Sequence, residues 1–372
     1  MTDITHGASN DLIEPRRGIV EKSWEWARAN LFNSVLNSLL TLVIAYALVR
    51  LAIPLINWAI VDATFSAPND AACKARGGAC WAFIASWSQF LLFGRFPEDA
   101  RWRPGLVIVI FVALMLVSSR ARVSGKALLG LWAGGVAVSL ALMFGGFLGM
   151  EYVETELWNG VPLNLLLTIG GCGFAFPVAI LSALGRRSRM PAIQWISIGY
   201  IELIRGVPLI TVLFMATVMV PLFLPSGVTI AKLWRAEVAF TLFFGAYLAE
   251  AIRGGLQVIP RGQYEAADAL GLGYWRKTWL VVLPQALTIS IPSLVNTSIS
   301  AFKDTVLITI VGIFDVLGDV NNAMNAPEWR SAYWEGYSFV ALIFFAVCFY
   351  MSRYSQRLER SLSRARPGPG RR

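Results

Sequence analysis

The sequence is poor in the residues from which most enzyme active sites are built. Its 372 residues include one histidine, His6, and four cysteines. A Ser–His–Asp triad, a histidine acid–base pair and a His/Cys zinc site therefore have no donors in the body of the chain. The phosphate-binding pattern G-x-x-x-x-G-K-[ST] is missing too, since Ser124–Ala127 lacks the upstream glycine and the hydroxyl residue. We therefore expect no catalytic site, no metal and no cofactor in this chain.

Charged residues are also scarce, at 15% of the chain, whereas apolar residues make up 56%. A soluble domain has about 25% charged and about 45–50% apolar residues. The apolar residues gather in runs, and about 20 such residues allow a helix to cross a membrane. The pattern predicts an all-α, polytopic membrane protein with about eight spans, at Leu36–Ile60, Gly105–Ser118, Ala127–Gly149, Leu163–Leu184, Ile196–Leu224, Val238–Ile252, Leu280–Ala301 and Ser338–Met351.

The basic residues indicate how these spans are oriented. Most of the 32 Lys and Arg residues lie on one side of the eight predicted spans. By the positive-inside rule that side is the cytoplasm, so both termini are expected there. Topology then explains the net charge of +9, and binding to nucleic acid is disfavoured. The basic segments are the tail before Leu36, Arg120–Lys126, Gly185–Arg189, Arg253–Lys277 and the chain from Arg353 onward.

The chain divides into four parts. Residues 1–34 form a polar cytoplasmic tail without the features of a cleaved signal peptide. Residues 35–150 hold three spans and a long periplasmic loop, in which the aromatic segment Cys80–Phe96 predicts an interfacial helix and not a ninth span. Residues 151–360 hold the other five spans. Residues 361–372 form a basic tail that is expected to be disordered.

The cysteines fall into two groups. Cys73 and Cys80 share the outer loop, where a disulfide and two free thiols fit the sequence equally well. Cys172 and Cys348 fall inside predicted spans and are expected to be ordinary packing residues.

A short polar segment between two spans has the features of a docking helix. From Gln263 the sequence favours a helix, because Ala and Leu are strong helix formers and Gly271 suits a left-handed C-cap. The small residues Ala266 and Ala267 let another surface approach the backbone closely, as for a helix in a groove of a second protein. On these residues alone, a solvated connector without a partner fits equally well.

The same segment resembles the signature of permease subunits of ATP-binding-cassette (ABC) importers. That EAA motif is Glu-Ala-Ala, three residues, Gly, nine residues, an aliphatic residue, one residue and Leu-Pro. It corresponds here to Glu265, Ala266, Ala267, Gly271, Val281, Leu283 and Pro284. The resemblance implies a coupling helix within residues 260–278 that docks onto a separate ATPase subunit, which would bind ATP and magnesium.

Other stretches resemble the polar amino-acid branch of this permease family. They are Tyr200–Ile210, Ala246–Leu256 and Asn296–Leu307. The part before about residue 160 resembles the extension of the larger permease subunit of general L-amino-acid uptake systems. The resemblance implies a five-helix permease core after a three-helix extension, in the inner membrane of a bacterium.

The resemblance also implies partners and a cargo. The cargo would be L-amino acids, and the partners a cytoplasmic ATP-binding subunit, a second related permease subunit and a periplasmic amino-acid-binding protein. The alternative is a secondary transporter of amino acids driven by an ion gradient. That alternative leaves the spacing of the coupling segment unexplained, and no inverted repeat supports it.

Charged residues inside the spans are candidates for the translocation path or a gate. Each costs about 2.5–3.5 kcal/mol to insert into the membrane, so it is seldom kept there without a role or a partner. Glu202 and Arg205 are three residues apart, as are Glu250 and Arg253, so each pair can meet on one helix face in a purely structural role. Pro208 predicts a bend, because proline removes a backbone donor. The candidates are Glu202, Arg205, Gly206, Pro208, Glu250, Asn296, Lys303 and Asp304.

Lys303 and Asp304 are adjacent in the sequence. On a helix they point about 100° apart, so they can meet the ammonium and carboxylate of a zwitterion without neutralising each other. Alternatively, both lie at the outer interface and extend their charges into water.

Overall fold

The structure is a computed structural model that describes residues 18–120, 124–330 and 332–364. His6 and the final tail residues 365–372 lie outside the described residues. The described residues form helices and no β-strand, with one isolated bridge between Gly160 and Asp315. The chain divides into two compact units, Met1–Thr64 with Cys73–Ala79 and Phe65–Ala72 with Cys80–Arg372.

The first unit contains one long apolar helix. α1 (Ile19–Asn30) falls within the expected polar tail, and α2 (Val35–Ile56) matches the first predicted span. The Ser34 side chain caps α2 by accepting a hydrogen bond from the backbone N–H of Asn37. All 22 residues of α2 are described, and none of them is buried. A helix that is apolar on all sides and exposed in the single chain is suited to contact with lipid or with another membrane helix.

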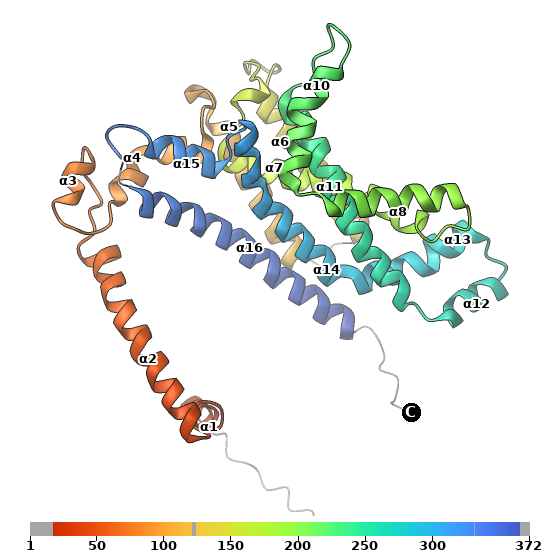
Figure 1. Ribbon diagram of the computed structural model, residues 1–372, viewed down its shortest axis with the longest axis horizontal. Helices are drawn as coiled ribbons and strands as arrows, with labels where there is room; N and C mark the ends of the chain where they lie inside the picture. The colour runs from red at the N-terminus through yellow and green to blue at the C-terminus, as the bar shows by residue number, and fades with distance from the viewer. Residues whose placement is uncertain (1–17, 121–123, 331, 365–372) are drawn as a thin grey trace, which may run out of the picture. The chain divides into compact units, whose positions relative to one another are not determined.

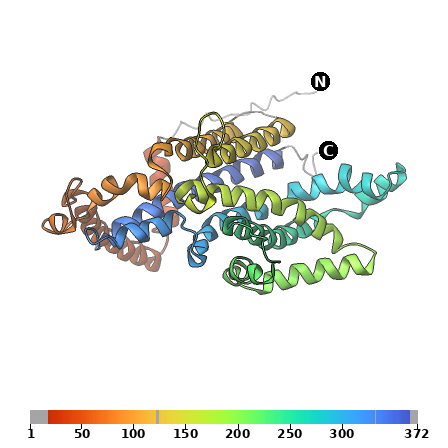
Figure 2. The same cartoon turned by 90° about the horizontal axis from the view of Figure 1, so that it is seen from above.

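The core of the second unit forms where α7 (Gly160–Gly185) packs against α11 (Lys232–Val258). α14 (Leu283–Asp304) packs on α11, and α16 (Tyr333–Arg364) packs on α14, as Figures 1 and 2 show. Small buried residues let α7 and α11 approach closely, as is usual between membrane helices. They include Ala175, Ala179 and Ala183 of α7 and Ala236, Ala239, Ala246 and Ala249 of α11.

Six helices among the described residues can cross a membrane by length and composition, and two bent helix pairs raise the number to eight. The predicted count of eight therefore corresponds to the upper figure. α5 (Trp102–Arg120) and α6 (Gly125–Phe144) are the second and third spans. α6 ends at Phe144 and not at Gly149 as predicted, because Gly145 has a φ of +67° that does not continue a helix.

The fifth predicted span is broken, as the proline suggested. α8 (Pro191–Gly206) ends, Val207 is extended, and α9 (Leu209–Phe214) begins after Pro208. The helices before and after the break, Pro191–Gly206 and Leu209–Phe223, lie at 106° to each other. The proline ring disfavours a helical conformation at the residue before it, which accounts for the extended Val207. The second half continues through η4 (Met215–Met219) and α10 (Val220–Phe223).

The loop predicted to be periplasmic contains α3 (Asp70–Lys74), α4 (Trp81–Phe93) and η2 (Glu98–Ala100). α4 is apolar but has 13 residues, which is too short for a ninth span. Cys73 and Cys80 are disulfide-bonded, whereas Cys172 and Cys348 are free thiols.

α16 extends further than the predicted boundary of the last tail. It continues to Arg364, so residues 361–364 are helical and not disordered as predicted. The helix can run on because the first helix-breaking residue, Pro367, comes three positions later.

Candidate functional site

The coupling segment forms the helix α12 (Arg261–Ala269), which follows α11 at an angle of 75°. Pro260 stands at its N-cap, so the helix begins slightly before the predicted Gln263. Gly271 has a φ of +70°, the left-handed conformation expected of a glycine just past a helix end. A side chain with a Cβ would be strained there, although no neighbouring atom would block it.

α12 has one side against its own chain and one side free. Ala267 is only 2% exposed, whereas Glu265 and Ala266 are exposed. Leu270, at the end of the helix, is 77% exposed, and Trp275 is 61% exposed. Small side chains next to exposed large apolar ones offer a surface that another protein can cover.

Contacts on the other side of α12 tie it to the helices that follow. Asp268 forms an ion pair with Lys277 in α13 (Tyr274–Lys277). Gln285 of α14 donates a hydrogen bond to Oε1 of Gln263, at 2.9 Å. The chain then passes through η5 (Thr278–Val282) into α14, which starts at the motif's Leu283-Pro284 pair. Leu283 is buried and Pro284 is exposed at the first turn, where a missing N–H costs nothing.

Arg187, just past the end of α7, connects α12 to the membrane helices. Its guanidinium donates to the hydroxyl of Tyr264 in α12, at 3.3 Å, and to the backbone carbonyl of Leu256 in α11, at 2.9 Å. Its charge also lies 5.9 Å from the centroid of the Tyr264 ring. A displacement of α12 therefore acts directly on the ends of α7 and α11.

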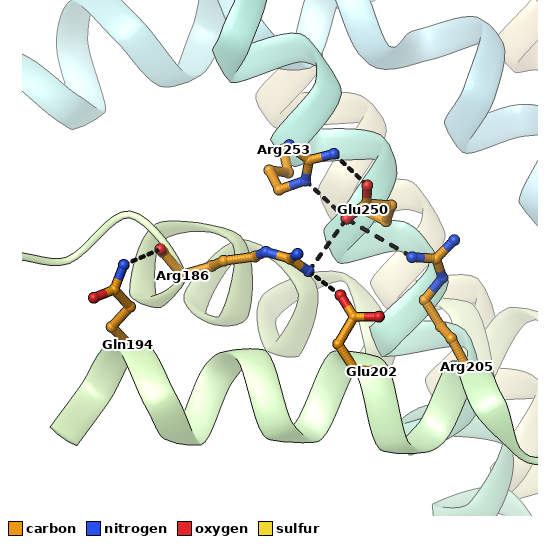
Figure 3. A network of polar contacts seen from close by, with 6 residues as sticks. All are labelled: Arg186, Gln194, Glu202, Arg205, Glu250 and Arg253. Carbon is orange, nitrogen blue, oxygen red and sulfur yellow. Dashed lines mark hydrogen bonds and ion pairs between the residues drawn. The ribbon is translucent and has the colours of Figure 1, made fainter. Parts of the chain in front are cut away.

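The residue before it, Arg186, opens a group of five charged side chains that we call the charge cluster: Arg186, Glu202, Arg205, Glu250 and Arg253 (Figure 3). Arg186 Nη1 lies 2.8 Å from Glu202 Oε1 and 3.7 Å from Glu250 Oε2. Glu250 also accepts from Arg253 Nε at 2.8 Å and lies 3.9 Å from Arg205 Nη1. One carboxylate is thus shared by three guanidinium groups from the ends of α7, α8 and α11.

The structure bears out one of the two predicted pairs and contradicts the other. Glu250 and Arg253 meet on one face of α11, as predicted. Glu202 binds Arg186 in place of Arg205, whose charge turns towards Glu250 and lies 5.5 Å from the ring centroid of Tyr247. The spacing within α8 permits the predicted pair, but Arg186 at the end of α7 lies beside Glu202, and Glu250 and Tyr247 of α11 lie beside Arg205.

The remaining candidates lie elsewhere. Gly206 and Pro208 form the break between α8 and α9. Asn296 and Lys303 are exposed on α14, and Asp304 is half-buried at its end. Within the described residues, no hydrogen bond or ion pair joins these three to the charge cluster. Their place in a translocation path stays a prediction.

A second polar centre, which the sequence did not reveal, lies at the other end of α7. We call it the Asn164 network: Asn164, Thr305, Thr309 and Asp315. The Asn164 side-chain amide donates to Thr305 Oγ1 at 2.7 Å and to Asp315 Oδ2 at 3.0 Å, and Thr309 donates to Asp315 Oδ1 at 2.8 Å. Asp315 also caps α15 (Val316–Met324) by accepting from the backbone N–H of Gly318 at 2.9 Å.

Two buried carboxyl groups were also missed. Glu237 of α11 is 9% exposed and packs over Gly170, where a Cβ would lie 2.1 Å from its Oε1. It directly precedes the predicted span Val238–Ile252, so the apolar pattern gave no sign that its side chain is buried. Asp319 of α15 is completely buried, and among the described residues the backbone N–H of Gly160 faces its carboxyl without meeting full hydrogen-bond geometry. Burial, reinforced by the neighbouring carboxyl of Asp315, raises the pKa of Asp319 to about 8.

The described residues contain no group of three or more His, Cys, Asp or Glu side chains arranged to hold a metal. The candidate site therefore consists of the short helix α12, the charge cluster beside it and the broken helix pair α8–α9.

Comparison with known proteins places the chain in a family of transport proteins. Residues 175–364 match the family described as binding-protein-dependent transport system inner membrane component. Over 345 residues the chain is 46% identical to the inner membrane amino-acid ABC transporter permease protein YhdY of Escherichia coli (strain K12), with 92% of this chain and 93% of that protein covered. The chain belongs to this family of inner membrane transport components.

Other members are similar over different lengths. The glutamate/glutamine/aspartate/asparagine transport system permease protein BztC of Rhodobacter capsulatus is 36% identical over 424 residues, covering 95% of this permease chain and 97% of BztC. A chain of a solved amino acid ABC transporter crystallised with histidines is 28% identical and covers 54% of this permease chain and 90% of its own length, with a TM-score of 0.48.

Membership of the family has two direct consequences. The protein is a multi-pass inner membrane permease component of a binding-protein-dependent transport system, as the motif around Glu265 implied. The alternative of a self-sufficient secondary transporter receives no support.

Proposed function

We propose that this permease imports L-amino acids, forms the translocation pathway by alternating access and is driven by a separate ATP-hydrolysing subunit. The cargo class is supported by the names of YhdY and BztC, which are related to this chain over nearly its whole length. The ATPase subunit would bind ATP and magnesium. A periplasmic amino-acid-binding protein would deliver the cargo, and a second, related permease subunit would complete a heterodimer.

The proposal rests above all on α12. One side of this helix is exposed at Glu265, Ala266 and Leu270, and the other side is attached to α7, α13 and α14. A protein that holds the free side can therefore move the ends of several membrane helices together. The basic segments near α12 support a cytoplasmic position for it and for both termini.

The charge cluster provides the next step of this coupling. Arg187 contacts α12, and its neighbour Arg186 binds Glu202 of α8 and Glu250 of α11. Movement of α12 would thus change the packing of α7, α8 and α11 near the break at Pro208. Each nucleotide state of the ATPase must bind the two permease conformations with different affinity, because a ligand without that difference shifts no equilibrium.

The test is reconstitution with the matching ATPase, second permease and binding protein in vesicles. We expect Gly271→Val to strain the end of α12 by about 1–2 kcal/mol and Glu265→Lys to reverse a charge on its free side, so that each lowers substrate-stimulated ATP turnover by roughly tenfold. Gly227→Val is the matched control for the glycine, since Gly227 also has a positive φ, of +89°, and open space around it but lies between α10 and α11.

Three results would contradict the proposal. One is ATP turnover in both α12 variants equal to that of the Gly227→Val control. Another is amino-acid uptake by this chain alone that an uncoupler abolishes, which would support an ion-driven transporter. The third is a wild-type complex that takes up no L-amino acid with its binding protein.

A further inference from the structure

A polar pocket of about 230 Å³ lies at the start of α11, separate from the charge cluster. Three charged residues contribute to its wall: Arg95, Glu156 and Lys232. Arg95 follows α4 in the N-terminal extension, Glu156 belongs to η3 (Thr155–Leu157) and Lys232 is the first residue of α11. The rest of the wall consists of Thr155, Leu157, Leu233 and the turn at Gly312, Ile313 and Phe314.

The three charges are not neutralised by one another. Within the part of the chain that the structure describes, none of them has an ion pair within 4.0 Å. Arg95 instead lies over the ring of Phe314, with its guanidinium carbon 4.9 Å from the ring centroid. The ammonium of Lys232 faces the turn at Gly312: a Cβ added to Gly312 would lie 3.5 Å from Lys232 Nζ. Arg95 and Glu156 are exposed and Lys232 is half-buried, so water meets these charges in the empty pocket, and a ligand with groups of opposite charge can replace that water.

The backbone adds to the positive side of the pocket. Ala231 at the N-cap of α11 offers no side-chain cap, so the first N–H groups of this helix are left without one. The positive end of the helix dipole therefore points to the same region as the Lys232 ammonium. Glu156 supplies the single negative charge in the wall.

We propose that this pocket binds the zwitterion of a free α-amino acid at the outer face of the permease. The α-carboxylate lies between Arg95 and Lys232, and the α-ammonium meets Glu156, each through charge-assisted hydrogen bonds. The amino-acid side chain lies against Leu157, Leu233 and Phe314. The inference rests on the proposed function, which supplies the cargo class and the outward position of this end of α11.

The charge pattern distinguishes this ligand from simpler ones. A cation would be repelled by Arg95 and Lys232, and a plain anion would leave the Glu156 carboxylate without a partner of opposite charge. A zwitterion satisfies both sides at once. Because Arg95 comes from the extension and Lys232 from the core, the site also gives the extension a direct part in receiving the cargo.

Binding to the purified complex of both permease subunits and the ATPase, without the binding protein, tests the site. The probes are labelled L-glutamine, N-acetyl-L-glutamine, which lacks the ammonium, and L-glutaminamide, which lacks the α-carboxylate. We expect Arg95→Gln and Glu156→Gln each to weaken L-glutamine binding to this site by about tenfold or more. Arg330→Gln and Glu154→Gln are matched controls, because both side chains are exposed outside the pocket, and they should bind as the wild type does.

The analogues separate recognition from a general structural effect. Glu156→Gln should not weaken binding of the N-acetyl probe, and Arg95→Gln should not weaken binding of the amide probe, because each probe lacks the group that the mutated residue would meet. A variant that weakens all three probes equally would overturn the assignment of that residue.

Two further results would overturn the proposal while leaving the proposed function intact. One is unchanged L-glutamine binding in both pocket variants of a complex that still takes up amino acids with its binding protein. The other is weaker attachment of the binding protein to Arg95→Gln with unchanged binding of free L-glutamine, since the carboxylate would then belong to a protein. Failure of the wild-type complex to import any amino acid would instead refute the proposed function.

Discussion

The two ends of α7 carry polar centres of opposite character. At one end the Asn164 network is buried, with Thr305 and Asp315 at 0% exposure and Asn164 at 1%. At the other end the side chains of the charge cluster are between 24% exposed for Arg253 and 56% exposed for Glu202. The first centre is made of directed hydrogen bonds around one carboxylate, and the second of ion pairs that compete for one carboxylate.

This difference indicates which end of α7 moves. In a dry interior a satisfied hydrogen-bond network holds one geometry, because breaking any bond leaves a buried polar group unpaired. Ion pairs near solvent are worth about 0–1 kcal/mol each and can exchange partners at little cost. We therefore expect the end of α7 at Asn164 to act as the fixed point and the end at Arg186, next to α12, to move.

Removing the carboxylate of the Asn164 network should have the largest effect. Asp315→Ala leaves the amide of Asn164, the hydroxyl of Thr309 and the N–H of Gly318 without their acceptor, at an expected cost of about 3 kcal/mol in stability. Thermal unfolding of the purified chain measures it. Asp99→Ala, at an exposed residue, is the control. A loss below about 1 kcal/mol, within the range of ordinary surface changes, would refute the fixed-point interpretation.

The pH dependence of stability should reveal the buried Asp319 next to this network. Its pKa rises from the ordinary 3.8 to about 8, so at pH 6 to 7 the folded chain keeps a proton that the unfolded chain has lost. The contribution of Asp319 to the free energy of unfolding therefore falls by about 1.4 kcal/mol per pH unit between those two pKa values and levels off above the higher one.

Melting temperatures of the wild type and of Asp319→Asn across this pH range check the prediction. Asparagine carries no ionisable group, so the stability of the variant relative to the wild type should increase as the pH rises towards 8. The charged groups around Asp319 are Asp315 and Arg95, and both remain in the variant. A stability difference that is the same at every pH would show that Asp319 does not hold a proton in the folded chain.

The smallest effects on stability should come from the charge cluster, where activity and stability are expected to separate. Glu250→Gln removes the carboxylate shared by three arginines, and Glu202→Gln removes a carboxylate whose single ion pair among the described residues is with Arg186. Each should change stability by less than about 1 kcal/mol. Glu250→Gln should nevertheless lower substrate-stimulated ATP turnover clearly more than Glu202→Gln. Equal turnover in both variants would argue against a shared role for Glu250.

Features that depend on neighbouring residues in the chain were predictable. Gly271 marks the end of α12 because its φ of +70° suits glycine, and Pro208 marks the break in the fifth span because proline acts on the residue before it. The Glu250–Arg253 pair was likewise predictable, since three residues along a helix bring side chains to one face. The end of α6 was wrong by a few residues because apolar composition alone does not reveal the positive φ of Gly145.

Contacts between segments that are distant in the sequence could not be predicted from neighbouring residues. Glu202 has Arg205 within reach on its own helix, yet it binds Arg186, because the packing of α7 beside α8 brings a closer partner. Asn164 and Asp315 are 151 residues apart in the sequence, and nothing in either neighbourhood indicates that they meet. The pocket of Arg95, Glu156 and Lys232 likewise exists because four separate segments converge, the fourth being the turn at residues 312–314.

Local chemistry along the chain thus decides the membrane class of this permease, its apolar spans and the position of its coupling helix, since hydrophobic length and backbone preference act within a few residues. The tertiary structure alone decides which charges become partners and which polar groups are sealed from water. Those outcomes depend on the energy of burial and on competition among side chains, and both are set by the helices that pack together.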